Sequence, residues 1–276
     1  MITAFGSCRI PTIYNYQYSE YTHSTKEVIQ ILEWVKNINS LDSIYTPNIN
    51  ILNKNIYSPS DFIRDINRTK TMIEKSSIVI IEVSTIKIAK LDNLYLNYHY
   101  YQIWDTLSST LDKAKRLNQT QKIIEKTKQL VHKDKLDTNY IHNNINIYKQ
   151  DSIELLEDIR YISKLLLGFN KHIKIIFIPH INPKTNGDVT HSHLDAENLY
   201  LESRQLIYNT INNFIEGNIL DNHYMFYPND ILGDNPDLIF KRDSNGVINN
   251  WAHYNNESIN KLHMGFKQFI SKLVNR

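Results

Sequence analysis

The run SIVIIEVS, residues 77–84, is the stretch of the sequence that decides the fold. Its β-branched residues follow one another without the polar alternation of a half-exposed strand, which is typical of a strand covered on both faces. IKIIFIPHI (173–181) has the same character, and ITAFG (2–6) is a shorter apolar run that stops at Gly-Ser-Cys. Such strands belong mainly to parallel sheets between layers of helices. The sequence therefore predicts an α/β sandwich.

Amphipathic helical stretches separate the strands. A capping box, Ser24 with Glu27 three residues later, opens the first helix, which we expect to run to about Ile38. HYMFYP (223–228) is a weaker strand. The other helices are predicted at 58–75, 95–136, 152–167, 194–215 and 256–274. Strands and helices that alternate along the chain favour a mainly parallel sheet.

The long helical pattern between the strands indicates an insertion at about 92–150. It begins near Tyr95, and its second half is rich in lysine, as on a solvated helix face. Neither an internal repeat nor a disordered linker interrupts the chain. We therefore expect residues 1–276 to form a single domain that contains this helical insertion.

The composition excludes several classes of function. The chain has 276 residues and 7 Gly, and its glycines are too far apart for a G-x-G-x-x-G loop or a P-loop. With 31 basic and 29 acidic residues, the net charge of +2 is too balanced to indicate binding to nucleic acid or to an anionic membrane. No apolar run reaches the ~18 residues of a membrane-spanning helix. The N-terminus lacks a basic region before an apolar stretch, and Cys8 is the single cysteine, so we expect a cytoplasmic protein.

In a chain so poor in glycine, each glycine is expected at a backbone position that requires it. Gly168 and Gly217 are predicted to end helices. Gly265, inside the last predicted helix, suggests a close packing contact. Gly6 stands where the first strand must turn sharply to present Ser7.

Polar residues follow three of the predicted strands. In an open parallel sheet, ligands bind beyond the carboxyl ends of the strands, so these residues are candidates for a common site. The candidates are Ser7, Cys8, Arg9, Ser84, Thr85, Lys87, His180 and Asn182.

Ser7 is the candidate nucleophile. A serine in a turn between a buried strand and a helix can expose its hydroxyl, and the backbone N–H groups at Ser7 and Cys8 can stabilise an oxyanion. Such a serine needs a base. His253, in the loop before the last predicted helix, is the obvious one.

Three short segments resemble the sequence blocks of the SGNH (GDSL-type) hydrolases, in the variants whose first block reads Gly-Ser-Cys. They are AFGSCR (4–9), IVIIEVST (78–85) and NWAHY (250–254). The resemblance implies a three-layer α/β/α fold of the flavodoxin-like kind, with a serine nucleophile and a histidine base. Members act on acyl esters, often O-acetyl groups on sugars, and some are acyltransferases.

The resemblance assigns Ser7 as nucleophile and His253 as base, but the chain departs from the family at other positions. Asn250 replaces the usual Asp three residues before the histidine; it can orient the imidazole but cannot stabilise imidazolium by charge. Asp243 is an alternative partner. The oxyanion-donating Asn of the third block is also missing. The residues that could substitute for it are Ser84, Thr85, Lys87 and Asn182.

Three alternatives remain open. Cys8 beside Arg9 could be the nucleophile as a thiolate, although a small buried residue behind Ser7 is favoured. The missing Asp and Asn are also compatible with a catalytically inactive, glycan-binding module. A metal-dependent hydrolase is the third alternative, and its zinc or manganese ligands would be His180, His191 and His193, with Asp195 completing the shell.

We therefore expect an ester hydrolase or O-acyltransferase that acts on acyl groups, above all O-acetyl groups, of a carbohydrate. No cofactor or metal is expected, but a transferase would need acetyl-CoA or another acyl donor. Arg9 and Lys87 could bind a carboxylate or phosphate of the substrate or donor. The expected partner is a small-molecule or carbohydrate ester, with neither nucleic acid nor membrane.

Overall fold

The computed structural model describes residues 1–7, 9–14, 20–41, 59–96, 143–183, 194–217, 222–242, 244, 248 and 254–275. The chain divides into two compact units. The first consists of Met1–Tyr21, Ser77–Ser84 and His172–Arg276, and the second of Thr22–Ser76 and Thr85–Lys171.

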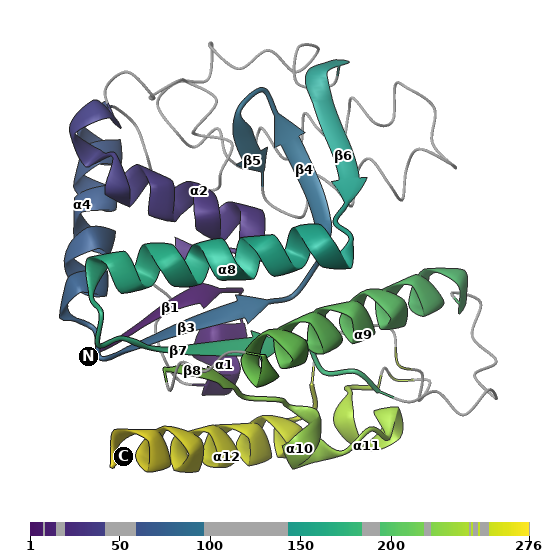
Figure 1. The fold of residues 1–276 in the computed structure, drawn as a ribbon. Helices are drawn as coiled ribbons and strands as arrows, with labels where there is room; N and C mark the ends of the chain where they lie inside the picture. The colour runs from purple at the N-terminus through teal and green to yellow at the C-terminus, as the bar shows by residue number, and fades with distance from the viewer. Residues whose placement is uncertain are drawn as a thin grey trace. The chain divides into compact units, whose positions relative to one another are not determined.

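A five-stranded sheet forms the centre of the first unit (Figure 1). Its strands lie in the order β2-β1-β3-β7-β8, and each neighbouring pair is parallel. The apolar runs expected to be buried form the three central strands. The bounds are β1 (Ile2–Gly6), β2 (Glu20–Tyr21), β3 (Ile78–Val83), β7 (Lys174–Pro179) and β8 (His223–Met225).

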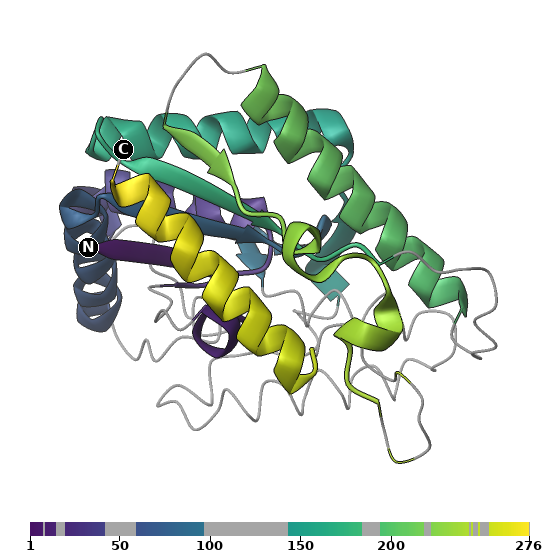
Figure 2. The same cartoon turned by 90° about the horizontal axis from the view of Figure 1, so that it is seen from below.

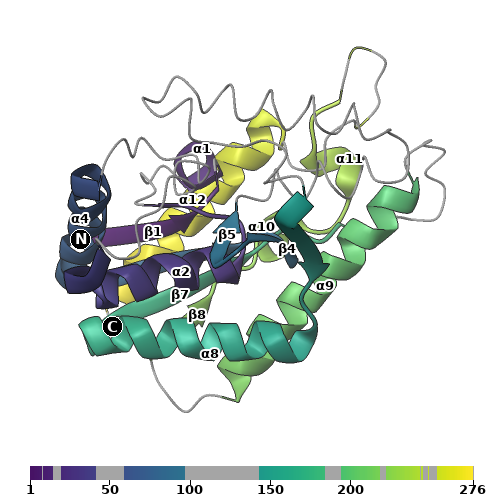
Figure 3. The same cartoon turned by 90° about the horizontal axis from the view of Figure 1, so that it is seen from above.

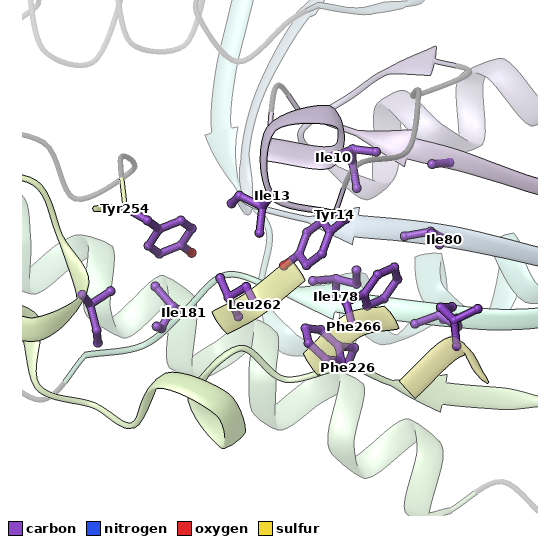
Figure 4. Close-up of a cluster of buried hydrophobic side chains, with 14 of the residues drawn as sticks. Ile10, Ile13, Tyr14, Ile80, Ile178, Ile181, Phe226, Tyr254, Leu262 and Phe266 are labelled. Atoms are coloured by element: carbon purple, nitrogen blue, oxygen red, sulfur yellow. The ribbon is translucent and has the colours of Figure 1, made fainter. Parts of the chain in front are cut away.

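One face of this sheet packs against two helices, α1 (Arg9–Tyr14) and α12 (Asn256–Val274). The register places Ala4, Ile80 and Ile176 side by side on that face. They belong to one buried cluster with apolar side chains of both helices, part of which Figure 4 shows. Figure 2 shows α12 running along the sheet with α1 beside it.

The opposite face is covered by α9 (Leu194–Glu216). Successive side chains of a strand point to opposite faces, so Phe177 lies on the other side of the sheet from Ile176. Its ring meets that of Phe214 in α9 edge-on, with the centroids 6.0 Å apart. The first unit is therefore an α/β/α sandwich with a parallel sheet, which confirms the predicted fold class.

Two short helices, α10 (Asn229–Leu232) and α11 (Pro236–Ile239), precede α12. Ile231 of α10 packs against Gly265 of α12, where an added Cβ would lie 2.8 Å from the Cδ1 atom of Ile231. The close packing contact expected at Gly265 is thus confirmed.

In its described residues, the second unit combines the helices α2, α4 and α8 with a three-stranded antiparallel sheet of order β5-β4-β6. Figure 3 shows α2 and α8 side by side, and α4 contacts both helices. The bounds are α2 (Thr25–Lys36), the 3₁₀ turn η1 (Ile38–Ser40), α4 (Pro59–Lys75), β4 (Lys87–Leu91), β5 (Leu94–Leu96), β6 (Ile145–Lys149) and α8 (Ser152–Phe169).

The prediction of a helix from Tyr95 is wrong for its first residues, and the insertion at 92–150 ends in a strand rather than a helix. Gln30 of α2 donates its side-chain amide to the carbonyl of Tyr95 and accepts from its N–H, at 3.1 and 2.8 Å. These bonds and the pairing of β5 with β4 outweigh the local helical preference. Residues 97–142, with most of the predicted helix, lie outside the described residues, and the single domain stays a prediction.

Gly168 does not end its helix as expected. α8 continues through Phe169, and the N–H of Asn170 donates to the carbonyl of Leu166. Gly217, by contrast, directly follows the last residue of α9, as predicted. In the described part of the chain, no helix is long and apolar enough to cross a membrane.

Glu27 in the capping box of α2 makes the stability of the protein depend on pH. The predicted box is present, and the Glu27 carboxylate accepts from the N–H groups of His23 and Ser24, at 3.0 and 2.9 Å. Burial nevertheless raises the pKa of Glu27 to about 7, against an ordinary value of 4.5. Because folding raises the pKa of this carboxyl, its protonated form stabilises the folded state. That stabilisation is complete below the pKa of the unfolded state and is lost as pH rises through the pKa of the folded state.

We predict that the free energy of unfolding of the wild type, minus that of Glu27→Gln, falls as pH rises from 4.5 to about 7. The slope should not exceed about 1.4 kcal/mol per pH unit, the value for one proton. Urea denaturation at a series of pH values measures this difference, and glutamine is a suitable replacement because it also serves in capping boxes. A difference that stays flat or rises over this range would contradict the prediction.

Candidate functional site

Ser7 lies directly after β1, in the connection to α1. It is buried, and its carbonyl accepts from the N–H of Ile10 at 3.0 Å as the chain enters the helix. Because β1, β3 and β7 are parallel, their carboxyl ends meet at one edge of the sheet. Ser7 therefore has the location that the sequence predicts.

Glu82 of β3 is the residue that binds Ser7. One oxygen of its carboxylate, Oε2, accepts from the backbone N–H of Ser7 at 2.6 Å and from the Ser7 hydroxyl at 2.8 Å. The other oxygen, Oε1, accepts from Nε of Arg9 at 2.5 Å. A buried carboxylate thus joins the side chains of Ser7 and Arg9.

Arg9 also contacts His180, which follows β7. Nη1 of Arg9 donates to Nε2 of His180 at 2.5 Å, so Nε2 must carry the lone pair. Nδ1 then carries the proton, and it lies 3.3 Å from the carbonyl of Ile181. Burial, and then the charges of Arg204 and Arg9, hold the pKa of His180 well below its ordinary value of 6.5. His180 is neutral at pH 7, and both of its ring nitrogens are engaged.

The ion pair of Arg9 with Glu82 is almost completely buried, with side-chain exposures of 12% and 3%. Burial disfavours the charged form of Arg9, but the nearby Glu82 carboxylate outweighs this and raises the pKa of Arg9 above its usual range. Loss of either partner would leave a buried, unpaired charge, which typically costs about 3–5 kcal/mol. The pair is therefore a structural constraint as well as a part of the site.

Gly6 gives Glu82 the space to reach Ser7. A Cβ atom at this position would lie 2.6 Å from Cγ1 of Ile10 and 2.8 Å from both Cβ and Oε2 of Glu82. The backbone of Gly6 does not have a positive φ. Glycine is thus required by the close approach of Glu82, and not by the sharp turn that we expected to explain it.

Tyr254 marks the point where the chain returns to this edge of the sheet. Its ring centroid is 6.4 Å from that of His180, and it stacks on Phe240 at 5.7 Å. The N–H of Asn255 donates to the carbonyl of Ile239, which fixes the chain before α12. Tyr254, the residue that follows His253, is therefore anchored beside His180, and it belongs to the buried cluster that Figure 4 shows in part.

The other candidates of the described chain have separate roles. The side chain of Asn182 donates to Gln205 in α9 at 2.6 Å, and its backbone exchanges hydrogen bonds with the side chain of Asn229. Asn182 thus connects the loop after β7 to two helices. Ser84 ends the β3 segment of the first unit.

Thr85 and Lys87 belong to the second unit. The N–H of Lys87 donates to the hydroxyl of Thr85 at 3.0 Å, and Lys87 opens β4 opposite Lys149. Their expected part in binding a substrate stays a prediction.

Several candidates lie outside the described residues, so their roles stay predictions. They are Cys8, His191, His193, Asp243, Asn250 and His253. Among the residues that are described, no group of three or more His, Cys, Asp and Glu could hold a metal ion. The ring of His180 is moreover engaged at both nitrogens, which disfavours it as a metal ligand.

Glu82 is not among the site residues that the sequence predicts, although a signal is present. It is the one charged residue in a strand of otherwise apolar residues, IVIIEV. Glutamate is rarely buried without a partner, so its place in such a run indicates a specific contact. The sequence does not show which residues supply that contact.

Comparison with known proteins gives one result for the family. A family model described as the TviD N-terminal domain matches residues 1–193, which include Ser7, Glu82 and His180. No curated protein and no solved structure matches the chain.

Gly6→Ala should lower the free energy of unfolding by about 1–3 kcal/mol, the usual cost of overpacking a closed site. The reason is the approach of the new Cβ to Glu82 and Ile10. Gly168→Ala is the matched control, because nothing lies within 4 Å of its added Cβ; it should stabilise α8 by ~0.4–1 kcal/mol. Urea denaturation measures both changes. Equal midpoints for wild type and Gly6→Ala would show that the close approach is not a constraint.

Proposed function

Since the chain belongs to the family of the TviD N-terminal domain, we propose that it transfers or hydrolyses acyl groups, above all O-acetyl groups, on a carbohydrate, with Ser7 as nucleophile. The match of residues 1–193 to this family model supports a carbohydrate-modifying role. The resemblance of AFGSCR to the first block of the SGNH hydrolases supports serine chemistry.

The oriented hydroxyl of Ser7 is the observation that carries this proposal. It donates its hydrogen to Glu82 at 2.8 Å and accepts from the N–H of Arg9 at 3.3 Å. A hydroxyl has two lone pairs, so one remains for attack on an acyl carbon. The site lies at the carboxyl ends of parallel strands, where open α/β sheets bind ligands.

His253 is the proposed base. His180 is unsuited to this role, because its Nε2 accepts from Arg9, and burial and the nearby arginine charges lower its pKa and so disfavour the protonated form that a base becomes. His253 is joined to Tyr254, whose ring lies 6.4 Å from that of His180, and consecutive Cα atoms are about 3.8 Å apart. The choice of His253 as base rests on this covalent link to a residue beside His180. Asn250 or Asp243 would orient its imidazole.

The proposed reaction has two steps. In the first step the Ser7 O–H turns from Glu82, its acceptor in this structure, toward His253. Oγ then bonds to the acyl carbon while the proton passes to His253, and the bond from that carbon to the leaving group breaks as the leaving group takes this proton. Water or a sugar hydroxyl then attacks the acyl-serine and gives its proton to His253, which passes it to Oγ of Ser7 as the bond between Oγ and the acyl carbon breaks; the result is hydrolysis or transfer. A transferase would take the acyl group from a donor such as acetyl-CoA, and neither route requires a metal or a resident cofactor.

Ser7→Ala is expected to lower kcat/KM for an aryl acetate by at least about 10³-fold, because it removes the attacking atom. A serine-directed fluorophosphonate should label the wild type at Ser7, as located by mass spectrometry of peptides. Ser271→Ala, which alters an exposed serine of α12, is the control and should retain full activity and labelling.

Two results would contradict this assignment. Equal activity of the wild type and Ser7→Ala would favour an inactive, glycan-binding module. Modification of Cys8 by a thiol reagent, with loss of activity and without labelling at Ser7, would transfer the nucleophilic role to the cysteine.

A further inference from the structure

Attack by Ser7 would place a negative charge on the acyl oxygen, and preorganised donors must stabilise it. The backbone N–H of Ser7, which the sequence suggests for this task, donates instead to Glu82 at 2.6 Å. The side-chain amide of Asn182, another candidate, donates to Gln205. Two of the expected donors are thus engaged in other bonds.

The Arg9 side chain has N–H groups that its hydrogen bonds to described residues do not use. Its side chain donates from Nε to Glu82 and from Nη1 to His180. A guanidinium carries more N–H groups than these two bonds use. No further hydrogen bond of this side chain to another described residue is present. A buried cation with available donors beside a nucleophile is suited to bind an anion.

The position of Arg9 relative to Ser7 is well defined. Arg9 is two residues from Ser7, and its backbone N–H donates to Oγ of Ser7 at 3.3 Å. The Ser7 hydroxyl and Nε of Arg9 bind the two oxygens of the same carboxylate, that of Glu82. Glu82 and His180 hold the guanidinium at two of its nitrogens, so little reorganisation is needed when charge develops next to it.

We infer that the Arg9 guanidinium donates to the oxyanion formed when Ser7 attacks its acyl substrate, and that Glu82 is the positioning residue that orients Arg9. This inference rests on the proposed function. As the bond from Oγ to carbon forms, the carbonyl π electrons move to the acyl oxygen, which accepts hydrogen bonds from Arg9. Arg9 keeps its protons, and the electron pair returns when the leaving group departs.

A purely structural role of Arg9 is the rival explanation. The buried carboxylate of Glu82 needs a cation, so removal of Arg9 alone could lower activity through misfolding. The rival predicts that activity returns once both charges are removed. The inference predicts that removal of both charges restores the stability of the fold but does not restore the activity.

The first experiment measures p-nitrophenyl acetate hydrolysis by Arg9→Ala. We expect kcat to fall by about 10²–10³-fold, the usual effect of losing one oxyanion donor, with little change in KM. Added guanidinium chloride at millimolar concentration should restore kcat at least about tenfold, and methylammonium should not, because it lacks the planar array of donors. Arg242→Ala is the control: this exposed arginine pairs with Asp237 and should be dispensable.

The second experiment uses the double variant Arg9→Gln with Glu82→Gln, which removes both buried charges. We expect its midpoint of urea denaturation to be higher than that of Arg9→Ala, while its kcat stays low and rises with guanidinium. Recovery of kcat in the double variant without guanidinium, or full activity of Arg9→Ala, would overturn the inference.

Labelling of Ser7 distinguishes failure of the role of Arg9 from failure of the proposed function. If the fluorophosphonate labels wild-type Ser7 and Arg9→Ala keeps its kcat, the role of Arg9 is wrong and the proposed function stands. If the wild type neither hydrolyses the acetate nor is labelled at Ser7, the proposed function fails, and the inference fails with it.

Discussion

The buried carboxylate of Glu82 is the interaction on which the rest of the site depends. An isolated charge inside a parallel sheet would cost several kcal/mol, so it must be paired and hydrogen-bonded. Ser7 supplies an N–H and an O–H, and Arg9 supplies the opposite charge. The side chain reaches them only because Gly6 has no Cβ. One electrostatic requirement thus explains why a glycine at the end of β1 is followed closely by a serine and an arginine.

This constraint also determines the ionic state of the neighbouring groups. Arg9 remains charged because Glu82 faces it, and the same guanidinium leaves His180 with its lone pair on Nε2. His180 is therefore an acceptor that holds Arg9, and the proposed base is a histidine from another segment. The proposed chemistry divides accordingly: Ser7 attacks, His253 takes the proton, and Arg9 stabilises the developing negative charge.

Local sequence patterns predicted much of the fold, but they failed where contacts between residues far apart in the sequence determine the structure. The apolar runs became the central strands, and the capping box of Ser24 and Glu27 formed as expected. The residues around Tyr95 predict a helix. Hydrogen bonds to Gln30, which is far away in the sequence, nevertheless hold Tyr95 in a strand. The sequence also placed Ser7, Arg9 and His180 at one edge of the sheet, because parallel strands end together, but it did not reveal their partners.

The sequence by itself determined the class of fold, the position of Ser7 after a buried strand and the absence of glycine-rich phosphate loops. These features follow from hydrophobic periodicity and residue spacing, which are local. Only the tertiary structure decided that Glu82 binds Ser7 and Arg9, that the Ser7 N–H is occupied, and that Gly6 is required by space. Each of these depends on strand register, which brings together residues about 75 positions apart and cannot be read from neighbours in the chain.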